Sequence, residues 1–231
     1  MRRLWPLVPV YVGLLLWVDR GVTLHQQYVL GALTWIVLIA AAWTLSPQRR
    51  AQVAVVVAAA TVGEVTGSLI WGVYHYRLDN LPLFVPPAHG LVYLTGIALA
   101  ASLRRHTRAL VWAAGVAAVA WGIAGLTVLP RLDVAGALGV PLLCLFLWRS
   151  RARATYAGVF FAVAALELYG TAIGTWQWAR ALPGLGIADG NPPSGVASGY
   201  VWFDVTALLV APYLLRAAAT RRRVVTAEGT S

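Results

Sequence analysis

A succession of apolar runs, each long enough to cross a membrane, dominates this sequence. About 20 mostly apolar helical residues span a bilayer core of about 30 Å. Eight such runs lie roughly at residues 4–22, 28–46, 52–75, 81–102, 108–128, 132–148, 154–178 and 196–216. The sequence therefore predicts an all-α integral membrane protein, with about eight transmembrane helices in one membrane domain over residues 1–216 and a disordered cytoplasmic tail over residues 217–231. The first run resembles a signal peptide, but Asp19-Arg20-Gly21 offers no small-residue cleavage site, so we interpret it as a span.

Composition excludes the soluble classes. Hydrophobic residues make up 60% of the chain and charged residues 11%, whereas a typical soluble domain has about 45–50% apolar and about 25% charged residues. The single cysteine, Cys144, excludes an intrachain disulfide. We therefore exclude a soluble enzyme, a disordered chain and a disulfide scaffold, and expect the lipid bilayer as the first partner.

The arginines predict the orientation. The net charge is +10, and all of the positive charge is arginine, in short clusters between the apolar runs. With eight helices, the clusters on one side are Arg2/Arg3, Arg49/Arg50, Arg104/Arg105/Arg108, Arg149/Arg151/Arg153 and Arg216/Arg221/Arg222/Arg223, and only Arg20, Arg77, Arg131 and Arg180 fall on the other. Because cytoplasmic loops carry the excess of positive charge, both termini are expected in the cytoplasm. This distribution explains the charge without a nucleic-acid partner. Arginine without lysine, with abundant Ala, Val and Gly, is typical of a GC-rich bacterial genome and predicts a multi-pass protein of a bacterial cell membrane.

The two halves of the chain resemble each other. Glu64-Val65-Thr66-Gly67 matches Glu167-Leu168-Tyr169-Gly170, and each continues to an aromatic pair and then to a double proline, Pro86-Pro87 or Pro192-Pro193. The offset is about 103 residues. We interpret this as a four-plus-four tandem repeat, with halves at about 1–103 and 104–216. Each half has an even number of spans, so the axis relating them should run along the membrane normal, and matching features should face each other.

Ionisable groups inside the predicted spans are the candidate catalytic residues: Glu64, Glu167, Asp204 and His89. Glu64 is 10 residues from Tyr74, or about 15 Å along a helix, which puts it near the bilayer midplane. A carboxylate there costs at least about 2.5–3.5 kcal/mol and usually marks a site or a pathway. A protonated carboxyl that only bonds a neighbouring helix is the structural alternative.

The residues around the two glutamates follow helical spacing. Glu64, Gly67, Trp71 and Tyr74 fall at i, i+3, i+7 and i+10, and Glu167, Gly170, Gly174 and Trp178 are similarly spaced. This predicts one helical face in each half, although the glycines also fit close helix packing and the aromatics also fit an interfacial belt. The candidate substrate-binding residues are Trp71, Tyr74, Tyr76, Tyr93, Trp176, Trp178, Tyr200 and Trp202.

Buried carboxyls beneath aromatic walls suit acid-initiated chemistry. Desolvation favours the protonated carboxyl, which is a proton donor, and aromatic faces stabilise cations. Protonation of an alkene or epoxide of a hydrophobic isoprenoid substrate gives a carbocation, from which ring closure makes a cyclase and capture of water makes a hydratase. The sequence shows no nucleotide fingerprint and no metal-ligand spacing, so no cofactor and no metal are expected.

The stretch Glu64-x-x-Gly67, Gly72-Val73-Tyr74-His75-Tyr76 and Val85-Pro86 resembles the signature of the membrane carotenoid-biosynthesis family that includes carotenoid 1,2-hydratases. The segment from Trp176-Gln177-Trp178 to Pro192-Pro193 is similar to that of the membrane lycopene cyclases of heterodimeric or fused type. The resemblance covers about residues 60–95 and 163–205. It implies a membrane enzyme of terpenoid metabolism, a cyclase, isomerase or hydratase acting on a long isoprenoid, with Glu64 as the matching glutamate.

The chain also departs from these families. The cyclase motif Pro-x-Glu-Glu is replaced by Pro86-Pro87-Ala88-His89 and by Pro192-Pro193-Ser194-Gly195, and Trp71 stands where hydratases have phenylalanine. Two other classes stay open: a proton-coupled small-molecule transporter, and a membrane assembly subunit that docks through its glycine faces. Homo-oligomerisation also stays open.

Overall fold

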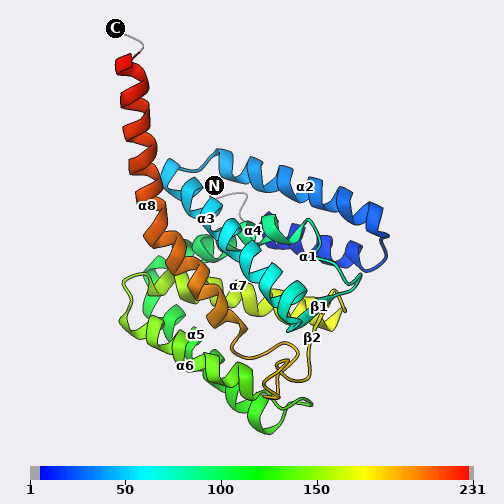
Figure 1. The fold of residues 1–231 in the computed structure, drawn as a ribbon. Helices are drawn as coiled ribbons and strands as arrows, with labels where there is room; N and C mark the ends of the chain where they lie inside the picture. Colours follow the sequence, from blue (N-terminus) through cyan, green and yellow to red (C-terminus); the bar gives the residue numbers. More distant parts are fainter. Residues whose placement is uncertain (1–5, 229–231) are drawn as a thin grey trace.

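The computed structural model describes residues 6–228, without the side chains of residue 218 and residues 221–228. Residues 1–5, with Arg2, Arg3 and the start of the first predicted run, and residues 229–231, at the end of the predicted tail, lie outside the described residues. A helix lies in each of the eight predicted runs (Figure 1). The helices are α1 (Leu7–Asp19), α2 (Leu24–Trp43), α3 (Pro47–Glu64), α4 (Val85–Ser102), α5 (Thr107–Thr127), α6 (Val134–Arg149), α7 (Arg153–Ala172) and α8 (Val196–Glu228). A π-helical segment, η1 (Val65–Trp71), continues α3, a 3₁₀ turn (Arg104–His106) precedes α5, and two short strands are β1 (Tyr74–Tyr76) and β2 (Trp176–Trp178).

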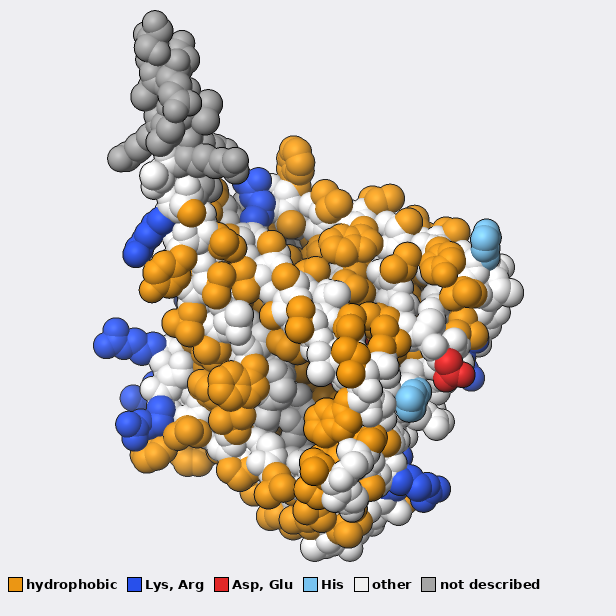
Figure 2. Space-filling view, in the orientation of Figure 1, with side chains coloured by type: hydrophobic (Ala, Val, Ile, Leu, Met, Phe, Trp, Pro, Cys, Tyr) orange, Lys and Arg blue, Asp and Glu red, His pale blue; other side chains and the backbone are white. Residues whose placement is uncertain are grey.

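Five helical segments within residues 6–228 are long and apolar enough to cross a membrane: Leu24–Trp43, Pro47–Trp71, Arg104–Thr127, Arg153–Ala172 and Val196–Ala217. The helices α1 and α6 are apolar but have only 13 and 16 residues. Hydrophobic side chains cover most of the visible face, with arginines at its edges (Figure 2). Large hydrophobic side chains are exposed, among them Trp43 at 76% and Trp112 at 74%. Such an apolar surface marks an all-α, multi-pass membrane protein.

Local sequence signals set the helix starts. Ser46 caps α3 by accepting a hydrogen bond from the Arg49 N–H, and Pro47 follows at the first helical position. Thr23 and Gln26 form a reciprocal capping box at the start of α2. Asp133 caps α6 by accepting from the Gly136 N–H. These caps place the helix boundaries in the polar segments between the apolar runs.

The core is a bundle of α3, α4, α7 and α8, in which α3 packs most closely against α8 and α4 against α7. Figure 1 shows α8 crossing α3. Glycines permit the close approach: a Cβ on Gly96 of α4 would lie 2.7 Å from the Val159 backbone nitrogen of α7, and one on Gly63 of α3 would lie 2.9 Å from the Phe203 ring of α8. Twelve of the 18 residues of α4 are buried, so this helix lies inside the bundle.

Several helix boundaries differ from the predicted runs by three to twelve residues, and three of these differences are at the ends of the third, seventh and eighth runs. The third and seventh runs were predicted to continue to residues 75 and 178, but the helical segments end at Trp71 and Ala172, before the aromatic pairs. The reason is a left-handed glycine after each helix, Gly72 with φ 74° and Gly174 with φ 78°. The last helix, α8, continues beyond residue 216 to Glu228.

Candidate active site

The aromatic pairs form a two-stranded ribbon beside the ends of α3 and α7. β1 and β2 are antiparallel, with Tyr74 opposite Trp178 and Tyr76 opposite Trp176. After Gly72 and Gly174 the chain reverses, so each pair folds back over the helix it follows. The predicted single helical faces, which ran straight from Glu64 to Tyr74 and from Glu167 to Trp178, are therefore wrong. The reversal brings the aromatic rings into direct contact with the acids.

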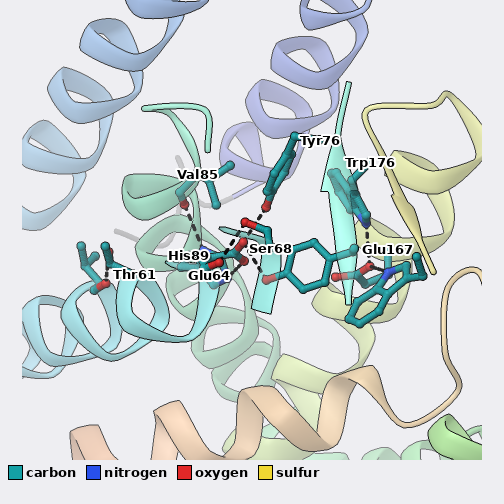
Figure 3. Close-up of polar contacts among 11 residues, drawn as sticks. Thr61, Glu64, Ser68, Tyr76, Val85, His89, Glu167 and Trp176 are labelled. Carbon is teal, nitrogen blue, oxygen red and sulfur yellow. Dashed lines mark hydrogen bonds and ion pairs between the residues drawn. The ribbon is translucent and has the colours of Figure 1, made fainter. Parts of the chain in front are cut away.

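Glu64, the last α-helical residue of α3, is held by three side chains (Figure 3). Its Oε2 accepts hydrogen bonds from the Tyr74 hydroxyl at 2.8 Å and from the Tyr76 hydroxyl at 2.8 Å. Its Oε1 lies 3.3 Å from His89 Nε2. His89 Nδ1 lies 3.0 Å from the Val85 carbonyl oxygen and must donate to it, because that oxygen only accepts. His89 Nε2 therefore faces Glu64 Oε1, and a hydrogen bond between these two atoms needs one proton on either of them.

Glu167 of α7 has the matching arrangement with different donors. Its Oε2 accepts from the Trp176 indole N–H at 2.9 Å and from the Trp178 indole N–H at 3.3 Å. An indole nitrogen only donates, so these directions are unambiguous. Gly170 lets the Trp176 ring lie against the helix, since a Cβ there would collide with that ring. Gly67 likewise lets the Tyr74 ring lie against the helix, since that ring would lie 3.0 Å from a Cβ added at Gly67.

The two glutamates and His89 line one cavity of about 160 Å³. The His89 ring stacks on Tyr200 of α8, with centroids 5.3 Å apart. The cavity thus has two carboxyl groups and an imidazole in a largely aromatic wall. The sequence-predicted residues that line it are Glu64, Tyr74, Tyr76, His89, Glu167, Trp176, Trp178 and Tyr200.

Four other predicted site residues lie elsewhere. Trp71 is 45% exposed and its indole N–H donates to the Pro183 carbonyl oxygen at 2.9 Å. Trp202 is 54% exposed on the outer side of α8. Tyr93 and Asp204 are buried, but neither lines the cavity.

Apolar lining residues were missed by the sequence analysis. They include Phe84 before α4, Phe203 of α8 and Gly63 of α3. Each is an unremarkable residue in an apolar run, and the only usable signal was that Gly63 directly precedes Glu64.

An apolar groove of about 450 Å³ adjoins the cavity. It lies among α1, α4 and α7, and Val12, Leu16 and Leu166 line both spaces. Its other lining residues are Pro9, Gly13, Val92, Thr95, Leu99, Phe161, Ala162, Ala165 and Tyr169. The groove and the cavity therefore lie on either side of Val12, Leu16 and Leu166.

The loop after β2 is organised by a buried aspartate. Asp133 accepts from the Gly190 N–H at 3.0 Å and from the Ser194 N–H at 2.6 Å. Asp189, in the same loop, is 1% exposed. Burial and the neighbouring Asp133 carboxylate raise the pKa of Asp189 to about 7.

Among residues 6–228 no three His, Cys, Asp or Glu side chains gather in a way that could hold a metal ion. Comparison with protein-family models, curated proteins and solved structures found no match. The fold and the site therefore define a class, a multi-pass helical membrane protein with a buried acid–histidine cavity.

Proposed function

We propose that this protein is a membrane enzyme that protonates a carbon–carbon double bond of an isoprenoid lipid and directs the carbocation to cyclisation or hydration. The observation that carries the proposal is the single cavity shared by Glu64, His89 and Glu167 beneath four aromatic side chains. It needs a substrate without strongly polar groups, because the remaining lining is apolar.

The dimensions support a substrate that enters from one end. An apolar cavity of about 150 Å³ can hold a benzene molecule, so 160 Å³ accommodates one ring or one terminal isoprene unit. The rest of a long isoprenoid would lie in the adjoining groove of about 450 Å³. Together the two spaces fall within the usual range for ligand sites, about 300–1,000 Å³.

The hydrogen bonds suggest different roles for the two carboxyl groups. Two phenols and the histidine face Glu64, which makes it the better stabilised anion and therefore the proton acceptor. Glu167 receives its two indole donors on Oε2, which leaves Oε1 to carry the proton that is transferred to the alkene. The faces of Tyr74, Trp176 and Trp178 would stabilise the cation.

The reaction balances without a cofactor. The Glu167 proton adds to one alkene carbon and leaves a cation on the neighbouring carbon. In cyclisation a second double bond attacks that cation, the Glu64–His89 pair takes a proton from an adjacent carbon, and the product mass is unchanged. In hydration water adds to the cation, its proton goes to the same pair, and the product gains one water.

The architecture proposed with this function is an eight-span, four-plus-four repeat with both termini in the cytoplasm. Matching hydrogen bonds support the repeat: Ser68 Oγ donates to the Glu64 carbonyl at 2.9 Å, as Thr171 Oγ1 does to the Glu167 carbonyl at 2.7 Å. Across the ribbon, the Arg77 N–H donates to the Thr175 carbonyl, and the Ala179 N–H donates to the Val73 carbonyl. The α3–α8 and α4–α7 contacts are also equivalent under such a two-fold axis.

The test is a pigment and isoprenoid-lipid profile by liquid chromatography–mass spectrometry. Wild-type protein, Glu64→Gln and Glu167→Gln are expressed in a carotenoid-producing bacterial host, with Asp79→Asn, at an exposed loop acid, as the matched control. We expect a new product of unchanged mass, or of one added water, in wild type and the control, and its loss in both glutamine variants. An unchanged profile in every strain, with the protein present in the membrane, would contradict the proposal.

Proton-coupled transport of a small molecule is the second candidate, and one observation favours it. The π-helical segment Val65–Trp71 interrupts α3 directly after Glu64, and interrupted helices beside midplane acids are typical of transporters. Uptake driven by a proton gradient in proteoliposomes would identify this function. The assembly-subunit alternative is weakened because Gly63, Gly67 and Gly170 already contact side chains of the same chain.

A further inference from the structure

A second apolar groove, of about 590 Å³, lies between α5 and α6 and shares no lining residue with the acid–histidine cavity. These two helices pack against each other on the side of the bundle opposite α2 (Figure 1). The groove follows α5 from Val111 to Ile123, is lined on the α6 side by Cys144, Leu147 and Trp148, and ends at Arg153 of α7. Several of its apolar side chains are exposed, so in a membrane the groove faces lipid.

The length and the floor of the groove suit a hydrocarbon chain. From Val111 to Ile123 the α5 axis rises about 18 Å, close to half of the bilayer core of about 30 Å, which is one leaflet. Gly115 lies in the floor. A Cβ there would be 3.9 Å from Leu147 Cδ1, with nothing nearer, so helix packing does not require this glycine. Its missing side chain instead leaves the floor of the groove open.

One end of the groove carries positive charge that no acid neutralises. Arg153 is exposed and lines this end. The Arg149 guanidinium lies 5.4 Å from the centroid of the Trp148 ring, so a second cation is beside the same end. Between residues 79 and 167 the sequence has a single acid, Asp133, which caps the opposite end of α6. The two ion pairs found among the described side chains involve neither of these arginines.

Two tryptophans place this end at the level of the lipid headgroups. Trp112 is near the start of α5 and Trp148 near the end of α6, and both line the groove and are largely exposed. Tryptophan is enriched where the hydrocarbon core meets the headgroups. Arginines at that level face phosphate groups, and a guanidinium donates well to phosphate oxygens.

We propose that this groove binds one anionic phospholipid. An acyl chain lies along α5 over Gly115, and the headgroup phosphate accepts hydrogen bonds from the guanidinium groups of Arg153 and Arg149. The lipid is a bound partner and undergoes no reaction there. Because the groove shares no residue with the acid–histidine cavity, a failure of this site and a failure of the proposed enzymatic function are separate results.

The test is lipid binding by the purified full chain, measured by native mass spectrometry. The protein in detergent is titrated with phosphatidylglycerol, which is anionic, or with phosphatidylcholine of the same acyl chains, which has no net charge. Arg153→Gln removes the charge, and Arg105→Gln, at an exposed arginine outside the groove, is its control. Gly115→Leu fills the floor, and Ala113→Leu, at an exposed position of α5 outside the groove, is its control. Unfolding temperatures without lipid report whether each variant is folded.

We expect wild type to bind one phosphatidylglycerol molecule at least about fivefold more tightly than phosphatidylcholine. Arg153→Gln should weaken phosphatidylglycerol binding about fivefold, which corresponds to about 1 kcal/mol, the usual contribution of one arginine near anionic lipid. Gly115→Leu should remove the tight site for both lipids, and the two controls should bind as wild type does.

Equal binding of the two lipids by wild type would overturn the proposed site, as would unchanged binding in both Arg153→Gln and Gly115→Leu. A protein dimer that is lost in Gly115→Leu, without any lipid preference, would also overturn it and would assign the groove to a second copy of the chain.

Discussion

Two substitutions of Glu64 distinguish its role in proton transfer from its role in holding the cavity together. Glu64→Gln keeps an oxygen that can accept from Tyr74 and Tyr76, and its amide can donate to a neutral His89 Nε2. Glu64→Leu is of similar size but removes the hydrogen-bond partner of all three groups. The two substitutions thus differ in hydrogen bonding, while both remove the carboxyl group.

The magnitude follows from the groups left without a partner. Each buried polar group that loses its hydrogen-bond partner costs about 1–3 kcal/mol. Three such groups face Glu64, so Glu64→Leu is expected to cost about 3–9 kcal/mol, a large part of the roughly 5–15 kcal/mol that stabilises a typical domain. Glu64→Gln should cost little stability but lose about 10²–10⁴-fold in rate, the usual contribution of a general acid or base.

The assay combines thermal unfolding in detergent with product formation for both variants. Leu69→Ala, at a lipid-facing position of η1 that is 53% exposed, controls for handling of the membrane sample. A Glu64→Leu protein that unfolds at the wild-type temperature would refute the hydrogen-bond network around Glu64. Full activity of Glu64→Gln would refute its role as a proton acceptor.

Three further perturbations test other parts of the structure. Gly158→Ala should destabilise the α4–α7 contact by about 1–3 kcal/mol, seen as a lower unfolding temperature, because the added Cβ would collide with the facing glycine carbonyl of α4. Gly13→Trp, at a groove position where an added Cβ meets nothing within 4 Å, should fill the groove and abolish product formation, whereas Leu14→Trp, on an exposed face of α1, should not. Asp189, whose pKa is raised from 3.8 to about 7 by burial and by Asp133, holds a proton in the folded protein that the unfolded chain has lost between these values. Stability should therefore fall as pH rises from about 4 to about 7, and Asp189→Asn should flatten this part of the unfolding-temperature profile.

The sequence predicted the helices because hydropathy is a local signal, and each apolar run contains a helix. The caps Ser46 and Asp133, which set the starts of α3 and α6, were not used, and the third run was predicted to start five residues too late. The sequence also singled out Glu64, Glu167 and His89, since polar groups are rare in such runs. It did not predict the chain reversals, because a glycine such as Gly72 inside an apolar run equally fits helix packing.

Other parts of the site could not be predicted, because the spacing of residues along one helix does not give the distances between residues on different helices. Asp204 and Tyr200 are one helical turn apart and were both predicted to belong to the site, but only Tyr200 lines the cavity. Phe84 and Phe203 line it without any polar signal in the sequence. Trp71 follows the expected helical spacing but lies outside, because the π-helical segment changes the angle between successive side chains.

The same π-helical segment explains a one-residue difference between the halves of the proposed repeat. Glu64 and Glu167 are 103 residues apart, whereas the left-handed Gly72 and Gly174 are 102 apart, so the first half has one more residue between acid and turn. A π-helical turn absorbs one extra residue without ending the helix. The two acids therefore keep equivalent places beside the ribbon while their partners differ, phenols and histidine on one side and indoles on the other. In the proposed mechanism this chemical difference, within a nearly symmetric frame, is what makes one carboxyl the donor and the other the acceptor.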